Sequence, residues 1–221
     1  ALEVDPTFAA AHMYLGRSYY RDFLDDEARP HLERAKGMNP DSARANNFLA
    51  VCLRRIAFRL RHAEAPGTST DKEWRSLYQR ALELHRLAMR IAEENPKRYP
   101  WAFSAYAMTL AQAVNEKALW DHDPSMPERN TVLEEALNKV NAVFPIRHTE
   151  QSNLIRHVRG LVLGTGAQLE DADSEFVAAI RCLRRNANVR SQKYREKLAE
   201  IYFHRGLLGT RPRTAQYRKA I

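Results

Sequence analysis

The sequence contains little glycine and cysteine and has no long hydrophobic run. Only 8 of its 221 residues are glycine and 2 are cysteine, which excludes collagen-like and disulfide-scaffold proteins. No stretch reaches the roughly 18 consecutive apolar residues that suggest a membrane-spanning helix, so we expect no membrane insertion. The two cysteines, Cys52 and Cys182, lie far apart in apolar helical patterns. We therefore expect buried thiols and a cytoplasmic location.

Motifs for catalysis, phosphate binding and metal binding are also absent. There is no G-x-G-x-x-G, no G-x-x-x-x-G-K-[ST] and no H-E-x-x-H. Asp121-His122-Asp123 has metal-ligand residue types, but Pro124 follows it and a turn is the better interpretation. Several histidines on predicted helices lack ligand spacing: His31, His62, His85, His157 and His204. We predict no enzymatic activity, no cofactor and no metal.

The residues that are abundant favour helices. Hydrophobic residues make up 44% of the chain and charged residues 28%, which is typical of a globular protein. Alanine and leucine outnumber valine and isoleucine, a balance that suits helices and not sheets. The 35 basic and 27 acidic residues give a net charge of +8. Such a charge is compatible with an acidic peptide, a nucleic acid or a membrane surface as partner.

Two segments of the chain repeat. Pro6 and Pro40 lie 34 residues apart, and each ends an Ala-x-x-x-Asp/Asn-Pro segment. Between them the order is His12-x2-Leu15-Gly16-x2-Tyr19, then Ala28-x3-Leu32-x2-Ala35. Over residues 1–53 this resembles the tetratricopeptide (TPR) family, with His12 in place of the family's tryptophan and Leu32 in place of its phenylalanine.

The same spacing predicts a helical hairpin without reference to any family. Apolar residues recur at intervals of three or four, so they form one stripe on each of two consecutive helices. The small residues Gly16 and Ala28 allow these helices to approach closely, and Pro40 ends the second helix. Because one hairpin leaves a face uncovered, such units stack on one another.

Similar helix pairs are predicted along the rest of the chain. We predict one domain over 1–221, with a truncated repeat ending at 1–6, helix pairs at 8–40, 43–96, 100–145 and 150–187, and an incomplete unit at 190–221. The predicted fold is all-α, a right-handed superhelical solenoid of antiparallel helix pairs. Because the chain begins without an initiator methionine, we expect it to be a fragment of a longer protein.

The fourth pair permits two registers. One places Leu154, Val158 and Leu161 inward, and we prefer it. The other uses Gly160 and Ala172, which have the same separation as Gly16 and Ala28, but it turns arginines inward.

The resemblance implies that the first helix of each pair lines a concave groove that holds peptides or helices. Helical geometry places the following residues on that side: Met13, Arg17, Tyr20, Arg21, Arg44, Asn47, Val51, Arg54, Arg55, Ala102, Tyr106 and Thr109. Guanidinium groups bind carboxylates, and aromatic rings supply apolar contact area. We therefore predict a non-catalytic scaffold that binds an acidic, partly apolar peptide or helix. Family members that clamp a C-terminal carboxylate are matched poorly, since Met13 and Arg17 replace their lysine and asparagine.

Three alternatives remain open. Arginines are good helix formers, so this face is also compatible with simple solvation. A second function is nucleic-acid binding through a C-terminal basic region: Arg181, Arg184, Arg185, Arg190, Lys193, Arg195, Lys197, Arg205, Arg211, Arg213, Arg218 and Lys219. A third is a sensor or oligomerisation arm of a larger signalling protein or enzyme.

Overall fold

A computed structural model describes residues 8–63, 71–94, 99–120, 124–143, 150–186 and 192–209. These residues form α-helices and contain no strand, which confirms the predicted all-α class for this part of the chain. Along the described ranges the helices are α1 (Ala9–Arg21), α2 (Asp25–Met38), α3 (Ala43–Ala63), α4 (Asp71–Glu93), α5 (Pro100–Asn115), α6 (Met126–Asn141), α7 (Glu150–Thr165), α8 (Leu169–Asn186) and α9 (Gln192–Gly209).

Local sequence signals explain several helix ends. Helix α2 begins with Asp25, Asp26 and Glu27, whose carboxylates are favourable beside the positive end of a helix dipole. Pro100 occupies the first turn of α5, where a missing N–H costs nothing. Ser125 caps α6 through a reciprocal capping box with Glu128. The segments 1–7, 121–123 and 210–221 lie outside the described residues, and with them the predicted truncated repeat and Asp121-His122-Asp123.

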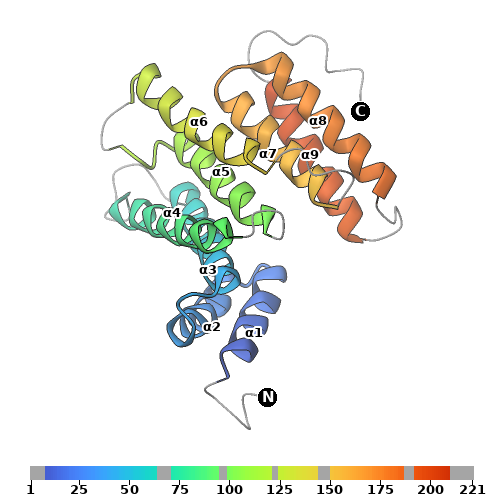
Figure 1. Ribbon diagram of the computed structural model, residues 1–221. Coiled ribbons are helices and arrows are strands. Elements are labelled where there is room, and N and C mark those ends of the chain that lie inside the picture. Colours follow the sequence, from blue (N-terminus) through green and yellow to red (C-terminus); the bar gives the residue numbers. More distant parts are fainter. Residues whose placement is uncertain are drawn as a thin grey trace.

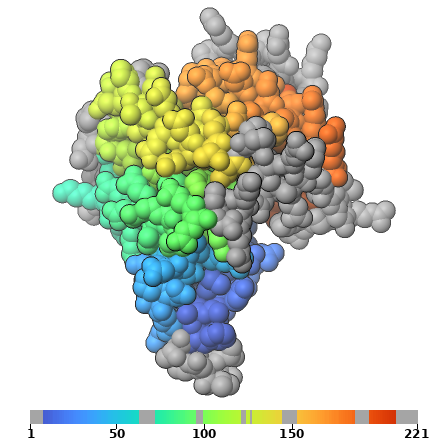
Figure 2. All heavy atoms as spheres, in the orientation of Figure 1, coloured from blue at the N-terminus to red at the C-terminus, as the bar shows by residue number. Residues whose placement is uncertain are grey.

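Neighbouring helices pack in pairs, and the pairs follow one another through the molecule (Figure 1). The most extensive contacts join α3 with α4, α7 with α8, and α1 with α2. Odd-numbered helices also meet, above all α5 with α7. Within the described ranges, each helix packs extensively only against helices one or two positions away. Figure 2 shows α1 and α2 as a narrow end of the molecule. No helix of the described part is both long and apolar enough to cross a membrane.

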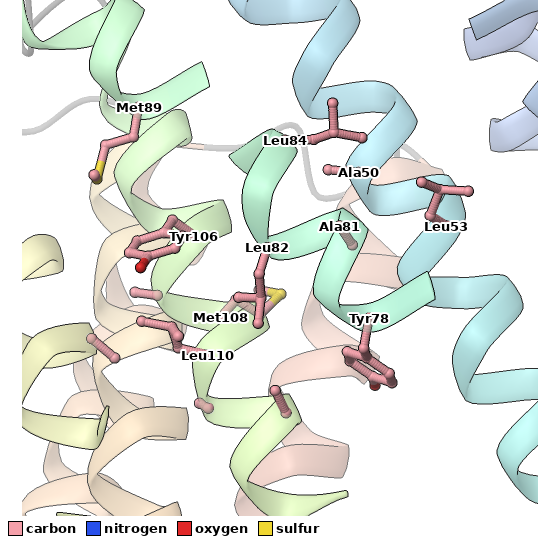
Figure 3. Packing of buried hydrophobic residues seen from close by; sticks show 14 of the residues in the cluster. Ala50, Leu53, Tyr78, Ala81, Leu82, Leu84, Met89, Tyr106, Met108 and Leu110 are labelled. Carbon is pink, nitrogen blue, oxygen red and sulfur yellow. The ribbon is translucent and has the colours of Figure 1, made fainter. Parts of the chain in front are cut away.

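A continuous hydrophobic core runs from α2 to α7. Its largest fully enclosed side chains include Trp74, Tyr78 and Tyr106. Leu84 of α4 lies beside Ala50 of α3, and Leu82 points toward α5 (Figure 3). A second cluster joins α7, α8 and α9. Helix α5 buries residues on nearly every side, so no single apolar stripe describes it.

The contact between α7 and α8 follows the register of Gly160 and Ala172. A Cβ atom at Gly160 would lie 2.8 Å from the ring of Phe176 on α8, so the close approach of the two helices occurs at this glycine. Arg156 and Arg159 do face α8, and both donate to the carboxylate of Glu175 at 3.1 Å. The preferred register also holds in part, because Val158 is fully buried and Leu154 and Leu161 pack partly buried against the core. It failed only in expecting the two arginines to stay outside, since Glu175 pairs with both of them.

Candidate functional site

The first helices of the N-terminal pairs enclose a hollow of about 300 Å³. We call it the N-terminal hollow. It is lined by Met13, Tyr14 and Arg17 of α1, by Arg44, Asn47 and Phe48 of α3, and by Trp101 of α5. Four predicted groove residues thus lie together: Met13, Arg17, Arg44 and Asn47.

The polar groups of the N-terminal hollow have few partners. Arg17 and Arg44 are exposed and make no ion pair or hydrogen bond with any residue that the structure describes. The Arg17 guanidinium lies 5.4 Å from the centre of the Phe48 ring, which holds it beside an apolar surface. The Asn47 side-chain oxygen is buried and accepts no hydrogen bond from any residue that the structure describes. The hollow therefore presents cations, a hydrogen-bond acceptor and aromatic rings together.

A second hollow of about 410 Å³ lies at the other end of α3. We call it the α3 C-terminal hollow. Its lining comprises Phe23, Asp25, Arg54, Arg55, Phe58, Arg59 and Gln112. Phe23 is 76% exposed and Phe58 50% exposed. This hollow also combines arginines with accessible aromatic rings.

Two arginines of the α3 C-terminal hollow are already neutralised. Arg55 pairs with Asp25 at 3.1 Å and donates to the backbone oxygen of Tyr20 at 2.9 Å. Its guanidinium also lies 4.7 Å from the centre of the Tyr20 ring and 4.5 Å from that of Phe23. Burial raises the pKa of Asp25, and Arg55 opposes that rise. Arg59 pairs with Asp26 at 2.6 Å. These contacts hold the α1–α2 turn against α3.

Arg54 differs from its neighbour. It is half-buried, lines the same hollow and has no hydrogen-bond or ion-pair partner among the described residues. Burial lowers its pKa, an effect that Tyr78, Tyr20 and Glu200 oppose. A desolvated guanidinium without a partner favours an anionic ligand.

The structure does not place Tyr106 in a groove. The prediction that its ring lines this side was wrong, because Tyr106 is fully buried and its hydroxyl accepts from Arg86 at 3.0 Å and donates to Glu135 at 2.7 Å. Ala102 and Thr109 are buried too. The physical reason is that α5 packs against α3, α4, α6 and α7, which leaves it little free surface.

The remaining predicted residues line neither hollow. Tyr20 lies beneath Arg55, Val51 is half-buried, and Arg21 is exposed. Sequence reasoning missed the aromatic lining, chiefly Tyr14, Phe48 and Trp101. Tyr14 and Phe48 each adjoin a predicted groove residue in the sequence, so a wider stripe on each helix would have included them.

Several members of the C-terminal basic region are engaged within the protein. Arg205 donates twice to Asp173, at 2.6 and 3.2 Å, and Lys197 pairs with Glu200 at 3.0 Å. Arg184 donates to the hydroxyl of Tyr202 at 3.2 Å. Arg190, Arg211, Arg213, Arg218 and Lys219 lie outside the described residues. The described part of this region is thus less available to phosphates than its composition suggests.

The two cysteines differ in burial: Cys52 is buried and Cys182 is partly buried. Neither Cys52 nor Cys182 forms a disulfide within the described part of the chain. Burial raises the pKa of Cys52 to about 12, which leaves the unreactive thiol at neutral pH.

Comparisons with known proteins give no further assignment. No protein-family model matches the chain, and no curated protein matches it either.

Proposed function

We propose that the chain is a TPR-like superhelical solenoid that acts as a non-catalytic interaction module. Three observations support this proposal: the His12–Ala35 spacing, the close approach of paired helices at Gly16 and Gly160, and the packing of each helix against near neighbours. The predicted cytoplasmic location belongs to the same proposal.

The proposed ligand is an acidic, partly apolar protein segment bound in the N-terminal hollow. The observation that carries this assignment is the pair of exposed arginines, Arg17 and Arg44, that line the hollow without a carboxylate partner among the described residues. Phe48 and Trp101 supply apolar contact area beside them. A volume of about 300 Å³ suits a few side chains of a peptide. An aspartate or glutamate next to an aromatic or aliphatic residue would satisfy both kinds of surface.

The test is a peptide array in which acidic and basic residues are varied next to an apolar position, probed with the purified chain. We expect selection of acidic peptides and a loss of at least 30-fold in affinity for Arg17→Ala/Arg44→Ala. This corresponds to about 2 kcal/mol, the lower range for a hot-spot arginine.

The matched control is Arg181→Ala/Arg185→Ala, which removes the same charge from exposed positions of α8. It should change affinity less than threefold. Equal losses of affinity for the two double variants would show that only net charge matters, which contradicts the proposal. The chain would instead be assigned to nucleic-acid binding if it co-purifies with nucleic acid that nuclease removes, and if Arg181→Ala/Arg185→Ala abolishes this binding.

A further inference from the structure

Helices α7 and α9 bring two histidines and a glutamate together. The ring nitrogens His157 Nε2 and His204 Nδ1 lie 2.7 Å apart, and the ring centres are 4.9 Å apart. Glu200 precedes His204 by one turn of α9, so both side chains leave the same face of the helix. One nitrogen of each ring and a carboxylate oxygen all lie within 4.8 Å of one another. This is the one group of three such residues among those described.

The environment keeps these ligand atoms in the forms that bind metals. Burial lowers the pKa of His157 to about 3, and burial also lowers that of His204. Both rings are therefore neutral near pH 7. Burial opposes ionisation of Glu200, but the ammonium group of Lys197 favours it, and the pKa of Glu200 lies below the ordinary value. The carboxylate is thus ionised.

A single hydrogen bond between His157 and His204 does not use the metal-binding capacity of the three side chains. Across the 2.7 Å contact one neutral imidazole donates its N–H and the other accepts through its lone pair. A metal ion would instead bind the lone pairs of both contact nitrogens, with each ring protonated on its other nitrogen. The other ring nitrogen of His157, Nδ1, is buried without a hydrogen-bond partner among the described residues. Two imidazole nitrogens and one carboxylate are, by contrast, a donor set that zinc prefers, with a fourth position open to water.

We propose that His157, Glu200 and His204 bind a divalent zinc ion that fastens α9 to α7. Tetrahedral zinc with zinc–nitrogen distances of about 2.0–2.1 Å holds two ligand nitrogens about 3.3 Å apart. The two ring nitrogens, now 2.7 Å apart, would therefore separate by about 0.6 Å on binding. This site lies apart from the N-terminal hollow and does not depend on the proposed peptide function.

Two cations near the site oppose the metal. Lys197 pairs with Glu200 at 3.0 Å and is about one quarter exposed, so its ammonium group can turn into solvent when the carboxylate binds zinc. Arg54 of α3 also acts on Glu200 and His204 through its charge. Removal of the Lys197 charge should therefore strengthen binding, an effect that a purely structural histidine pair does not produce.

The test uses the purified full chain, titrated with zinc by calorimetry and with cobalt by visible absorption. We expect one saturable site and, for cobalt, ligand-field bands of a low-coordinate nitrogen and oxygen site. His204→Gln and the isosteric Glu200→Gln should each weaken binding at least tenfold, whereas Lys197→Met should tighten it several-fold. Circular dichroism of each variant checks that α9 remains folded.

Two histidines serve as matched controls. His31 forms the other close histidine pair, 3.0 Å from His12, but that pair belongs to no three-residue ligand group among the described residues. His122 adjoins two aspartates outside the described residues. His31→Gln and His122→Gln should leave zinc affinity unchanged. The proposal is overturned by absence of saturable binding, by binding that ignores Glu200 and His204, or by binding lost on either control.

Discussion

The first and fourth helix pairs, α1/α2 and α7/α8, solve the same packing problem with different side chains. Gly16 faces Leu32 in the first pair, and Gly160 faces Phe176 in the fourth, each residue shifted by the same 144 positions. A Cβ atom at either glycine would lie under 3.0 Å from the opposing side chain. The contact therefore requires a residue without a side chain, while the partner varies from aliphatic to aromatic.

The polar contact beside the glycine has a different chemistry in the two pairs. His12 and His31 join α1 to α2 at 3.0 Å. At the equivalent positions of the fourth pair, Arg156 and Glu175 join α7 to α8 at 3.1 Å. A histidine pair and an ion pair thus serve the same connection. The comparison teaches that the fold fixes the position of this contact and leaves its charge free.

The turns inside the two pairs agree as well. Phe23 and Ala167 occupy equivalent positions with φ of 63° and 64°, a left-handed conformation that favours glycine. The next residue donates back to the first helix in both cases, from Leu24 to Tyr19 at 3.0 Å and from Gln168 to Leu163 at 2.9 Å. This agreement extends the likeness of the two pairs from their contacts to their backbone.

The largest effects should come from filling the space at the two glycines. Gly16→Ala and Gly160→Ala should each lower the free energy of unfolding by about 1–3 kcal/mol, because the added methyl group overpacks the helix contact. Urea unfolding followed by circular dichroism measures this loss. Gly37→Ala and Gly206→Ala are matched controls, since a Cβ atom there meets nothing within 4 Å. They should gain up to about 1 kcal/mol from helix propensity, and a shared response of all four variants would refute the proposed contact.

A smaller effect should follow from breaking the ion pair of the fourth pair. Glu175→Gln removes the carboxylate that accepts from both Arg156 and Arg159, and Glu175 is only 14% exposed. The free energy of unfolding should fall by about 1.5–2 kcal/mol, at the low end of the range for hydrogen bonds to charged groups. The exposed Glu134→Gln on α6 should cost less than about 0.5 kcal/mol. Equal effects of the two changes would show that the Glu175 contacts contribute nothing specific.

The smallest effect concerns acid, and it should distinguish the histidine pair from the ion pair. Burial, together with His12 and Arg34, lowers the pKa of His31 in the folded protein. The unfolded chain therefore binds more protons below its histidine pKa of about 6.5, and stability falls as the pH falls through that value. His31→Gln should make this decline shallower in thermal unfolding between pH 7.5 and 5.5. Gly37→Ala, which removes no titratable group, should keep the original slope, and an unchanged slope for His31→Gln would contradict the assignment.

The sequence predicts well what depends on spacing within one helix or between adjacent helices. The recurrence of Leu15, Gly16 and Tyr19 is sufficient to orient α1, because only one neighbouring helix covers it closely. Helical spacing does not predict the environment of Tyr106, because several helices enclose α5 and leave it without an exposed stripe.

Contacts between residues that are far apart in the sequence could not be predicted from helical spacing. Arg156 looks unsuited to an interior position until Glu175, 19 residues later, is placed opposite it. His157 and His204 are 47 residues apart and meet only because α9 folds back against α7. Periodicity gives the face on which a side chain lies, whereas the partner on that face comes from tertiary packing.

In the described part of the chain, extensive packing joins only helices that are one or two places apart. This restriction also affects how the chain unfolds. In the proposed solenoid, stability is approximately a sum of terms between near neighbours, so we expect the outer pairs to melt while the middle stays folded. Among the described residues, the narrow α1/α2 end packs against other helices on one side only. A peptide bound between α1, α3 and α5 would contact three neighbouring helix pairs at the same time. It would therefore couple the local unfolding of these pairs into one cooperative transition.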